Sequence, residues 1–333
     1  MKKVFKIIGI AAGILIAVMV ITSVADAFLD DEKVEKYDED SYCSSDTEND
    51  DAGEGNVCGD DSGNDSDSNG GSCMYDGSWS LGTAKVPDGT TVVVSIFTDD
   101  SVSSWNSDSA DDLNTMEDSL DYVGIACDWI SESSKKYGYD AQFVYDWSEN
   151  ADLGYTADVD CDIVKDEDNN TDVMDGFIDS NVPTDKLLSE YNADNILYLV
   201  YINTPDSNEE TSCTVSYYDG ASYPYEICFM YVNCEGEEEA PAAYAHEMLH
   251  TFGAIDLYMA DYSYDDYNIT QDFVDYIENS DGNDIMYTTY DAYTNEPHYD
   301  EITNELTDID AYYVGWLDDS ELADQWGLVD SEH

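Results

Sequence analysis

The sequence contains no arginine, and lysine supplies all ten of its basic side chains, against 77 acidic ones. The formal net charge of -67 at pH 7 repels other polyanions, and the guanidinium fork that reads phosphates and guanines is absent. No glycine-rich phosphate loop and no G-x-S-x-G nucleophile motif occurs either. The composition therefore excludes nucleic acid as a partner and leaves cations and neutral or basic chains.

None of the eight cysteines belongs to a C-x-x-C pair, so the spacing typical of a thiolate metal site is also missing. An even number of cysteines, all of which follow residue 27, indicates an oxidising compartment and up to four disulfide bonds. If all of them pair, at least one bridge joins the first three to the last five. The cysteines are Cys43, Cys58, Cys73, Cys127, Cys161, Cys213, Cys228 and Cys234.

Three lysines precede an uncharged run at residues 7–24, which leads into the tripeptide Ala25-Asp26-Ala27. The tripeptide is typical of a signal-peptide cleavage site, whereas the length of the apolar run suits an uncleaved membrane anchor. We therefore expect residues 1–27 to be a signal peptide or an N-terminal membrane anchor. Because the lysines stay on the cytoplasmic side, both alternatives place the rest of the chain outside the cell, secreted or anchored to the cell surface.

Residues 28–85 are dominated by Asp, Ser, Gly, Asn and Glu, and residues 60–71 contain no apolar side chain. Such a segment cannot bury enough surface to offset its ordering entropy, so it predicts an acidic disordered linker. In the following domain, repulsion between like charges opposes folding, so we expect structural Ca2+ or raised salt to stabilise it. The aspartates within residues 158–168 do not form an EF-hand loop, since Ile163 occupies the place of the required glycine.

Residues 86–333 show the pattern of an α+β domain. The β-branched residues at 90–97 and the apolar run at 196–202 predict strands, and apolar residues at three- and four-residue spacings over 109–137 predict a long helix. Further strands are expected at 142–145, 213–218 and 225–232. Further helices are expected at 184–191, at 238–241 with acids in the first turn and Pro241 at the first helical position, and along the apolar stripe formed by Ile302, Leu306, Ile309, Tyr313 and Trp316.

The helix expected around Pro241 contains the motif H-E-x-x-H, which accounts for two of the four histidines in the chain. One helical turn separates His246 from His250, so both imidazoles project from one face and can bind a single metal ion. Glu247 follows the first histidine and can reach a water bound to that ion. The alternative is a pair of histidines that only decorate an amphipathic helix.

Two further residues continue this pattern, because Gly253 follows His250 by three residues and Asp256 follows Gly253 by three. A third ligand beyond the helix end can face the first two only if the chain reverses, and glycine tolerates the left-handed conformation of such a turn. Asp256 would complete a catalytic zinc site of two histidines and one carboxylate. Such an ion activates its water and polarises a peptide carbonyl, while Glu247 moves the proton. The alternative for Asp256 is an ordinary surface acid.

The segment HEMLHTFGAID resembles the zinc signature HExxHxxGxxH of the metzincin metallopeptidases, in the variant with aspartate as the third ligand. Snapalysin-type and immune-inhibitor-A-type peptidases carry this variant, and the latter share the Asp-Leu-Tyr found at residues 256–258. The resemblance implies a metzincin or zincin-like α+β domain, with a mixed twisted sheet, a long backing helix, an active-site helix and a C-terminal helix. It also implies Zn2+ as the cofactor.

The same resemblance implies a methionine turn beneath the zinc, and Met286 within Asn-Asp-Ile-Met-Tyr is the matching residue. Met286 would then form a hydrophobic floor under the ligands, and the alternative is an ordinary core methionine. Metzincins usually carry a tyrosine two residues after this methionine. Thr288 stands at that position, with Tyr287 and Tyr290 on either side, so the tyrosine that assists the oxyanion is left open.

These features predict an extracellular zinc metalloendopeptidase that holds zinc through His246, His250 and Asp256. It would hydrolyse protein or peptide substrates with a metal-activated water and Glu247 as general base and acid. Two alternatives stay open, a non-catalytic surface module that binds zinc or calcium and a zinc amidase that acts on a cell-wall or small substrate. The intact Glu247 argues against the non-catalytic module. His298 is a weaker candidate ligand, because a lone loop histidine is more often not a ligand.

Overall fold

The computed structural model describes residues 85–166, 170–217, 225–258, 268–280 and 282–329. The expected signal peptide or anchor (1–27) and, apart from Lys85, the expected linker (28–85) lie outside these ranges. Within the described ranges, no helix combines the length and the apolar character needed to cross a membrane. The described residues fall almost entirely within the segment that the sequence predicts to be an α+β domain.

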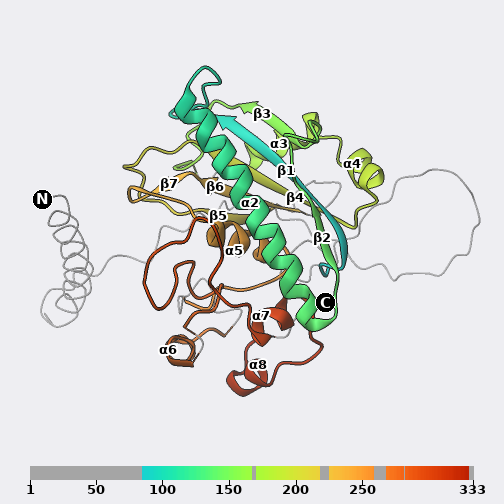
Figure 1. Cartoon of the computed structure of the whole chain (residues 1–333), viewed down its shortest axis with the longest axis vertical. Helices are drawn as coiled ribbons and strands as arrows, with labels where there is room; N and C mark the ends of the chain where they lie inside the picture. The colour runs from blue at the N-terminus through green and yellow to red at the C-terminus, as the bar shows by residue number, and fades with distance from the viewer. Residues whose placement is uncertain (1–84, 167–169, 218–224, 259–267, 281, 330–333) are drawn as a thin grey trace, which may run out of the picture. The chain divides into compact units, whose positions relative to one another are not determined.

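A six-stranded mixed sheet forms the centre of this segment (Figure 1). Its strands are β1 (Gly89–Asp99), β2 (Ala141–Val144), β3 (Gly154–Asp158), β4 (Asn195–Ile202), β5 (Cys213–Tyr217) and β6 (Tyr225–Tyr231). The strand order is β2-β1-β4-β6-β5, with β3 pairing along the second half of β1. All pairs are parallel except that of β5 with β6, so an antiparallel strand forms one edge. A separate hairpin follows, made of β7 (Asn233–Cys234) and β8 (Glu237–Glu238).

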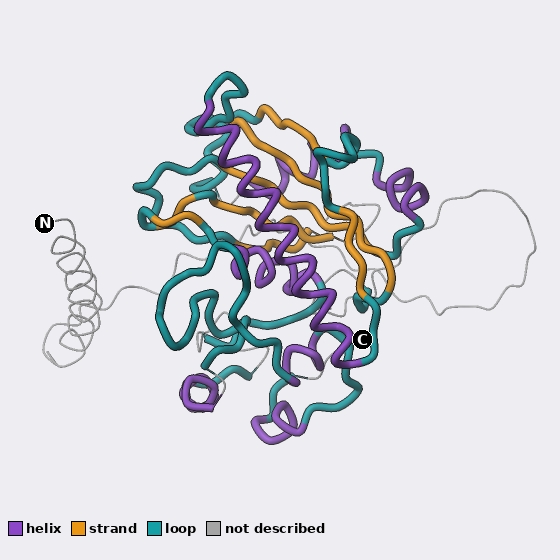
Figure 2. Tube along the Cα trace, viewed as in Figure 1, coloured by secondary structure: helices purple, strands orange, loops and turns teal. Residues whose placement is uncertain are grey.

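Helices cover both faces of the sheet. α2 (Ala110–Tyr137) and α5 (Pro241–Thr251) pack on one face, and Figure 1 shows α2 running across it. α3 (Asn170–Asn181) and α4 (Thr184–Tyr191) pack on the other face. In Figure 2 the strands lie above a C-terminal region of loops that carries three short helices, α6 (Gln271–Ser280), α7 (Asp308–Tyr313) and α8 (Glu321–Trp326). The described chain is thus a mixed α+β fold.

The central strands are buried on both faces because their sequences are nearly continuous apolar runs. Along β1, Val93 and Phe97 join the apolar cluster of α2 and α5, whereas Val92, Val94 and Ile96 join the cluster of α3 and α4. This division follows from the two-residue period of a strand. The strands expected at 90–97 and 196–202 are confirmed as β1 and β4, and those expected at 142–145, 213–218 and 225–232 as β2, β5 and β6.

The long helix expected at residues 109–137 is confirmed as α2. The hydroxyl of Ser109 caps its first turn by accepting a hydrogen bond of 3.3 Å from the backbone N–H of Asp112. Gly138 ends the helix in the left-handed conformation, with φ at 90°, and its N–H donates back to the last turn. The expected helix at 184–191 is confirmed as α4.

The expected C-terminal helix is shorter than its apolar stripe, because only α7 is helical there. Ile302 and Leu306 precede it in a non-helical segment. Two backbone hydrogen bonds of 2.9 Å hold that segment, one from Glu305 to the Asn283 carbonyl and one from Ile285 to the Glu305 carbonyl. At the start of α7, the Asp310 carboxylate then accepts a hydrogen bond of 2.9 Å from the Thr307 N–H. The helix predicted from the apolar stripe is therefore wrong at Ile302 and Leu306.

The expected helix at Pro241 is confirmed as α5, and the proline stands at its start. The acids expected in its first turn lie before the helix instead, because Glu238 pairs within the β7–β8 hairpin. The proline occupies the first turn, where its missing N–H leaves no helical hydrogen bond unmade. Other elements had no clear sequence signal, namely β3, α3, α6, α8 and the small hairpin.

The disulfide framework stays a prediction. Cys127, Cys161 and Cys234 form no disulfide within the described residues. Cys43, Cys58 and Cys73 lie outside the described ranges.

Candidate metal centre

α5 positions the two histidines and the glutamate of the H-E-x-x-H motif. Every residue of this helix except His250 is buried, so the helix lies inside the domain with no solvent-facing stripe. The Nε2 atoms of His246 and His250 lie 3.1 Å apart, as their one-turn separation predicts. Glu247, only 6% exposed, sits between them in sequence and faces the edge strand β5.

The carboxylate of Asp256 joins the two imidazoles. Its Oδ1 atom lies 3.1 Å from the Nε2 of His246 and 3.3 Å from the Nε2 of His250. Among the described residues, these three side chains are the group of histidine, cysteine and acidic side chains that is close enough to hold a metal ion. His298, the weaker candidate, does not belong to that group.

The spacing of these three atoms fits a tetrahedral zinc site. Zinc binds imidazole nitrogen and carboxylate oxygen at about 2.0–2.2 Å, which places two ligand atoms of a tetrahedron about 3.3 Å apart. The three observed separations of 3.1, 3.1 and 3.3 Å form a nearly equilateral triangle of that size. Two imidazoles and one carboxylate are also a ligand set typical of catalytic zinc.

A tight chain reversal after α5 brings Asp256 to the histidines. Gly253 adopts a φ of 102°, in the left-handed region that disfavours residues with a side chain. Its N–H donates to the His250 carbonyl at 2.9 Å, and the N–H of Ala254 donates to Leu249 at 3.1 Å, so the last carbonyls of the helix are satisfied. The reversal expected from the position of Gly253 is therefore present.

Backbone carbonyls orient both imidazoles. The Nδ1 atom of His246 lies 3.0 Å from the Ile285 carbonyl, and the Nδ1 of His250 lies 2.9 Å from the Ala254 carbonyl. A carbonyl can only accept, so each Nδ1 carries a hydrogen, and each Nε2 faces the centre of the triangle, where it would offer its lone pair to a bound cation. The sequence could not predict these two contacts, because main-chain carbonyls make them and any residue has one.

The segment around Met286 lies directly against the candidate metal ligands. The carbonyl of Ile285, the residue before Met286, orients His246. The Met286 carbonyl accepts a hydrogen bond of 2.9 Å from the N–H of Leu257, the neighbour of Asp256. The Met286 side chain is fully buried in the same apolar cluster as α5. The Asp284 carboxylate fixes the turn by accepting from the Met286 N–H at 2.7 Å. This placement fits the floor that the metzincin resemblance implies.

The three ligands strongly affect one another's charge. Burial by itself lowers the pKa of His250, but the neighbouring Asp256 carboxylate outweighs it and raises the pKa to about 10. Burial by itself raises the pKa of Asp256, but the two imidazoles hold it well below its usual range. The centre of the triangle is therefore a place where positive charge is favoured, as a site for a cation requires.

A threonine of the edge strand contacts the glutamate. The Oγ1 atom of Thr214, on β5, lies 2.7 Å from Oε2 of Glu247 and 3.0 Å from its backbone carbonyl. The two residues are 33 positions apart, and they meet because β5 runs beside α5. Sequence reasoning missed Thr214, and the chain offers no local pattern that would have revealed it.

Tyr258 is a tyrosine that reaches the candidate metal ligands. Its ring centroid lies 6.2 Å from that of His246, and its hydroxyl is hydrogen-bonded to Asp256. Burial raises the pKa of this phenol, and the Asp256 and Glu247 carboxylates raise it further. The two tyrosines beside the methionine are engaged elsewhere, because Tyr290 donates to Glu237 at 3.0 Å and Tyr287 lies near the acids of α6.

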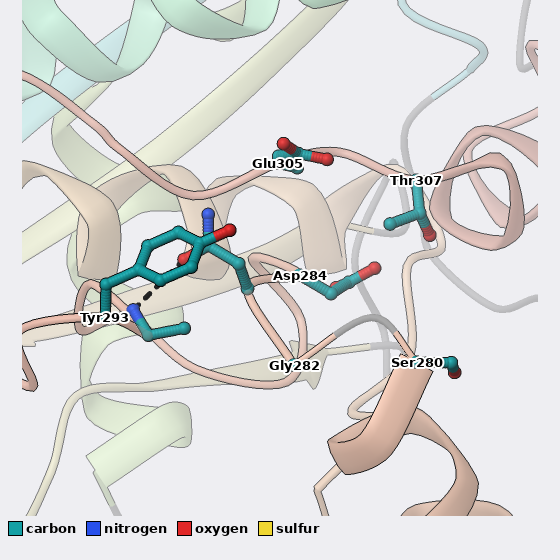
Figure 3. Close-up of a pocket in the computed structure, with 8 residues that line it drawn as sticks. Ser280, Gly282, Asp284, Tyr293, Glu305 and Thr307 are labelled. Carbon is teal, nitrogen blue, oxygen red and sulfur yellow. Dashed lines mark hydrogen bonds between the residues drawn. The ribbon is translucent and has the colours of Figure 1, made fainter.

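A cavity of about 270 Å3 lies beside the turn that supports His246 (Figure 3). Figure 3 shows Asp284 on that turn, Ser280 at the end of α6, and Glu305 and Thr307 on the segment that crosses above. The lining residues are Ser280, Gly282, Asn283, Asp284, Ala292, Tyr293, Glu305 and Thr307, and they include none of the three candidate ligands. The cavity is therefore separate from the metal centre.

No protein-family model and no curated protein matches this chain. The likeness to metzincins therefore rests on the residues of the signature and on the geometry around them.

Proposed function

We propose that the protein is an extracellular zinc-dependent endopeptidase with a metzincin-like catalytic domain. The observation that carries the proposal is the triangle formed by His246, His250 and Asp256, with Glu247 on the same helix. Its size fits zinc, and its three-ligand form leaves a fourth position for a reactant. The mixed sheet and the backing helix α2 are compatible with the metzincin fold but also with other folds. The extracellular placement rests on the apolar run at residues 7–24.

In this proposal, the two imidazoles and the Asp256 carboxylate hold the ion. Bound there, zinc supplies Lewis-acid chemistry, which activates water and polarises a peptide carbonyl. Glu247 acts as the general base that takes a proton from the attacking water, and then as the acid that gives it to the leaving amine. The burial of Glu247 and His246 excludes bulk water from their side chains, which strengthens such charge interactions.

The edge strand β5 supports a polypeptide as substrate. Among the described strands, β5 pairs only with β6, so its other edge can take an extended chain as a further strand. Thr214 of β5 contacts Glu247, so a chain docked on β5 would lie beside the proposed base. Backbone pairing of this kind is largely independent of side chains, and it places a peptide bond near the metal centre.

The test is cleavage of a mixed peptide library by the full-length protein, measured as purified, after removal of zinc, and after zinc is restored. We expect cleavage that disappears and returns with zinc. Glu247→Gln should lower the rate by at least about 10²-fold while zinc content stays unchanged, because it removes the proton acceptor but no ligand. Asp256→Asn should instead weaken zinc binding itself.

The matched control is Glu278→Gln, an exposed glutamate on α6, which should leave the rate unchanged. A folded, zinc-loaded protein that cleaves no peptide would contradict the proposal. That outcome would favour a non-catalytic module or a zinc amidase with a non-peptide substrate. Equal rates for wild type and Glu247→Gln would show that any cleavage comes from a contaminating peptidase or from another site.

A further inference from the structure

The contact between Thr214 and Glu247 joins two segments with different tasks in the proposed reaction. Thr214 belongs to the open edge strand, and Glu247 belongs to the helix that carries the candidate ligands. The hydroxyl lies within hydrogen-bonding distance of two acceptors on one residue, the carboxylate Oε2 at 2.7 Å and the main-chain carbonyl at 3.0 Å.

A threonine hydroxyl has one hydrogen to donate, so these two acceptors compete for it with the Cys228 sulfur, a weak acceptor 3.5 Å away. The carboxylate lies closer and is charged, and bonds to charged acceptors are the stronger ones. The Cys228 thiol lies 3.6 Å from the same main-chain carbonyl and can donate to it instead. Thr214 can therefore direct its hydrogen at Oε2, so that the other carboxylate oxygen of Glu247 stays available as a proton acceptor.

We propose that Thr214 is the positioning residue for Glu247, and that its hydroxyl fixes which carboxylate oxygen takes the proton. The inference rests on the proposed function. Its physical basis is that a glutamate has three rotatable bonds, and that ordering them in advance removes an entropic cost from the reaction. It also links substrate docking to the base, because a peptide that pairs with β5 pairs with the strand that holds Glu247.

The test compares Thr214→Val with Thr214→Ser in the full-length, zinc-loaded protein. Valine keeps the shape of threonine and the preference for a strand but removes the hydroxyl, whereas serine keeps the hydroxyl. We expect Thr214→Val to lower kcat about tenfold or more, with KM changed little, and Thr214→Ser to restore most of kcat. Zinc content and Tm should stay close to wild type in both variants.

The matched control is Thr98→Val on β1, which β4 and β6 separate from β5. The Thr98 hydroxyl is buried and has no hydrogen-bond partner among the described residues, so its loss should leave kcat unchanged. Equal kcat values for wild type and Thr214→Val would overturn the inference. So would an equal loss in the valine and serine variants, because that pattern follows from packing and not from the hydroxyl.

A second measurement separates this inference from the proposed function. Crystal structures of zinc-loaded wild type and Thr214→Val should show the Glu247 carboxylate in one conformer in the first and displaced in the second. An unchanged Glu247 conformer in Thr214→Val would overturn the inference, even in a protein that cleaves no peptide. Absence of cleavage by wild type, with Glu247 displaced in the variant, would overturn the proposed function alone.

Discussion

α2 and α5 pack on the same face of the sheet, but different forces stabilise them. α2 is 28 residues long, has Ser109 and Gly138 as caps, and buries one face. α5 is 11 residues long, has no side-chain cap, and buries every residue except His250. Local signals therefore account for much of α2, whereas α5 depends on burial among other elements.

This difference explains why the candidate site lies on α5. The helix carries His246 and Glu247 into the interior, where buried polar groups need partners. Segments far away in the sequence supply them: the Ile285 carbonyl, the Asp256 carboxylate and the Thr214 hydroxyl. The geometry of the site therefore depends on these contacts with distant segments.

The largest expected effect on stability comes from removing the support beneath α5. Met286→Ala empties a fully buried position in the α5 cluster and should lower the free energy of unfolding by about 2–5 kcal/mol. We also expect weaker zinc binding, because the adjacent Ile285 carbonyl orients His246. Chemical denaturation and a zinc titration with a competing chelator measure the two effects. Met286→Leu conserves volume and should cost less than about 1.5 kcal/mol.

Met174→Ala is the matched control for this comparison. Met174 is equally buried, but it lies on α3 in the cluster on the opposite face of the sheet. It should lower stability by a similar amount and leave zinc affinity unchanged. If the two alanine variants bind zinc equally well, Met286 is an ordinary core methionine and has no special role under the ligands.

A smaller effect should follow from weakening a local signal of α2. Ser109→Ala removes the N-cap and should lower stability by about 1 kcal/mol, or Tm by about 2–4 °C, with kcat unchanged. Thermal unfolding and peptide cleavage are the measurements. The control is Ser107→Ala, an exposed serine outside the helix, which should change neither. A fall in kcat with Ser109→Ala would mean that the stability of α2 affects the geometry of the candidate site.

The same contrast decides what the sequence could predict. The bounds of α2 and α4 and the positions of β1 and β4 follow from caps, periodicity and β-branched runs, which act within a few residues. The stripe that includes Ile302 and Leu306 misled, because backbone pairing with residues 283–285 outweighs helical spacing there. β3 was missed because its five residues, Gly154–Asp158, contain no apolar run.

At the candidate site, sequence spacing predicted the meeting of His246, His250 and Asp256, since all three lie within one helix and one turn. It could not predict Thr214 or the Ile285 carbonyl. Thr214 reaches Glu247 only through the register of β5 on β6, and a carbonyl has no residue signature. Zinc itself and catalysis stay predictions that the experiments above address.

The smallest expected effect concerns the start of α5. The Glu239 carboxylate there accepts hydrogen bonds from the Ser212 hydroxyl at 3.3 Å and the Ser212 N–H at 3.5 Å. Burial nevertheless raises the pKa of Glu239 above its ordinary value of 4.5, and the Glu247 charge adds to the rise. A raised pKa in the folded state means that ionisation opposes folding, so the cost is absent below the ordinary pKa and present in full above the raised, folded-state pKa.

Glu239→Gln removes that charge but keeps an acceptor for Ser212, so it should raise Tm at pH 7 by no more than about 4 °C. The gain should shrink as the pH falls toward 4, because the wild-type carboxyl is then protonated too. Thermal unfolding at several pH values measures both trends, with the exposed Glu209→Gln as the control that should show neither. A lower Tm for Glu239→Gln at pH 7 would mean that the charge itself stabilises the start of α5. The helix would then depend on a local electrostatic signal, as α2 does, and the contrast between the two helices would narrow.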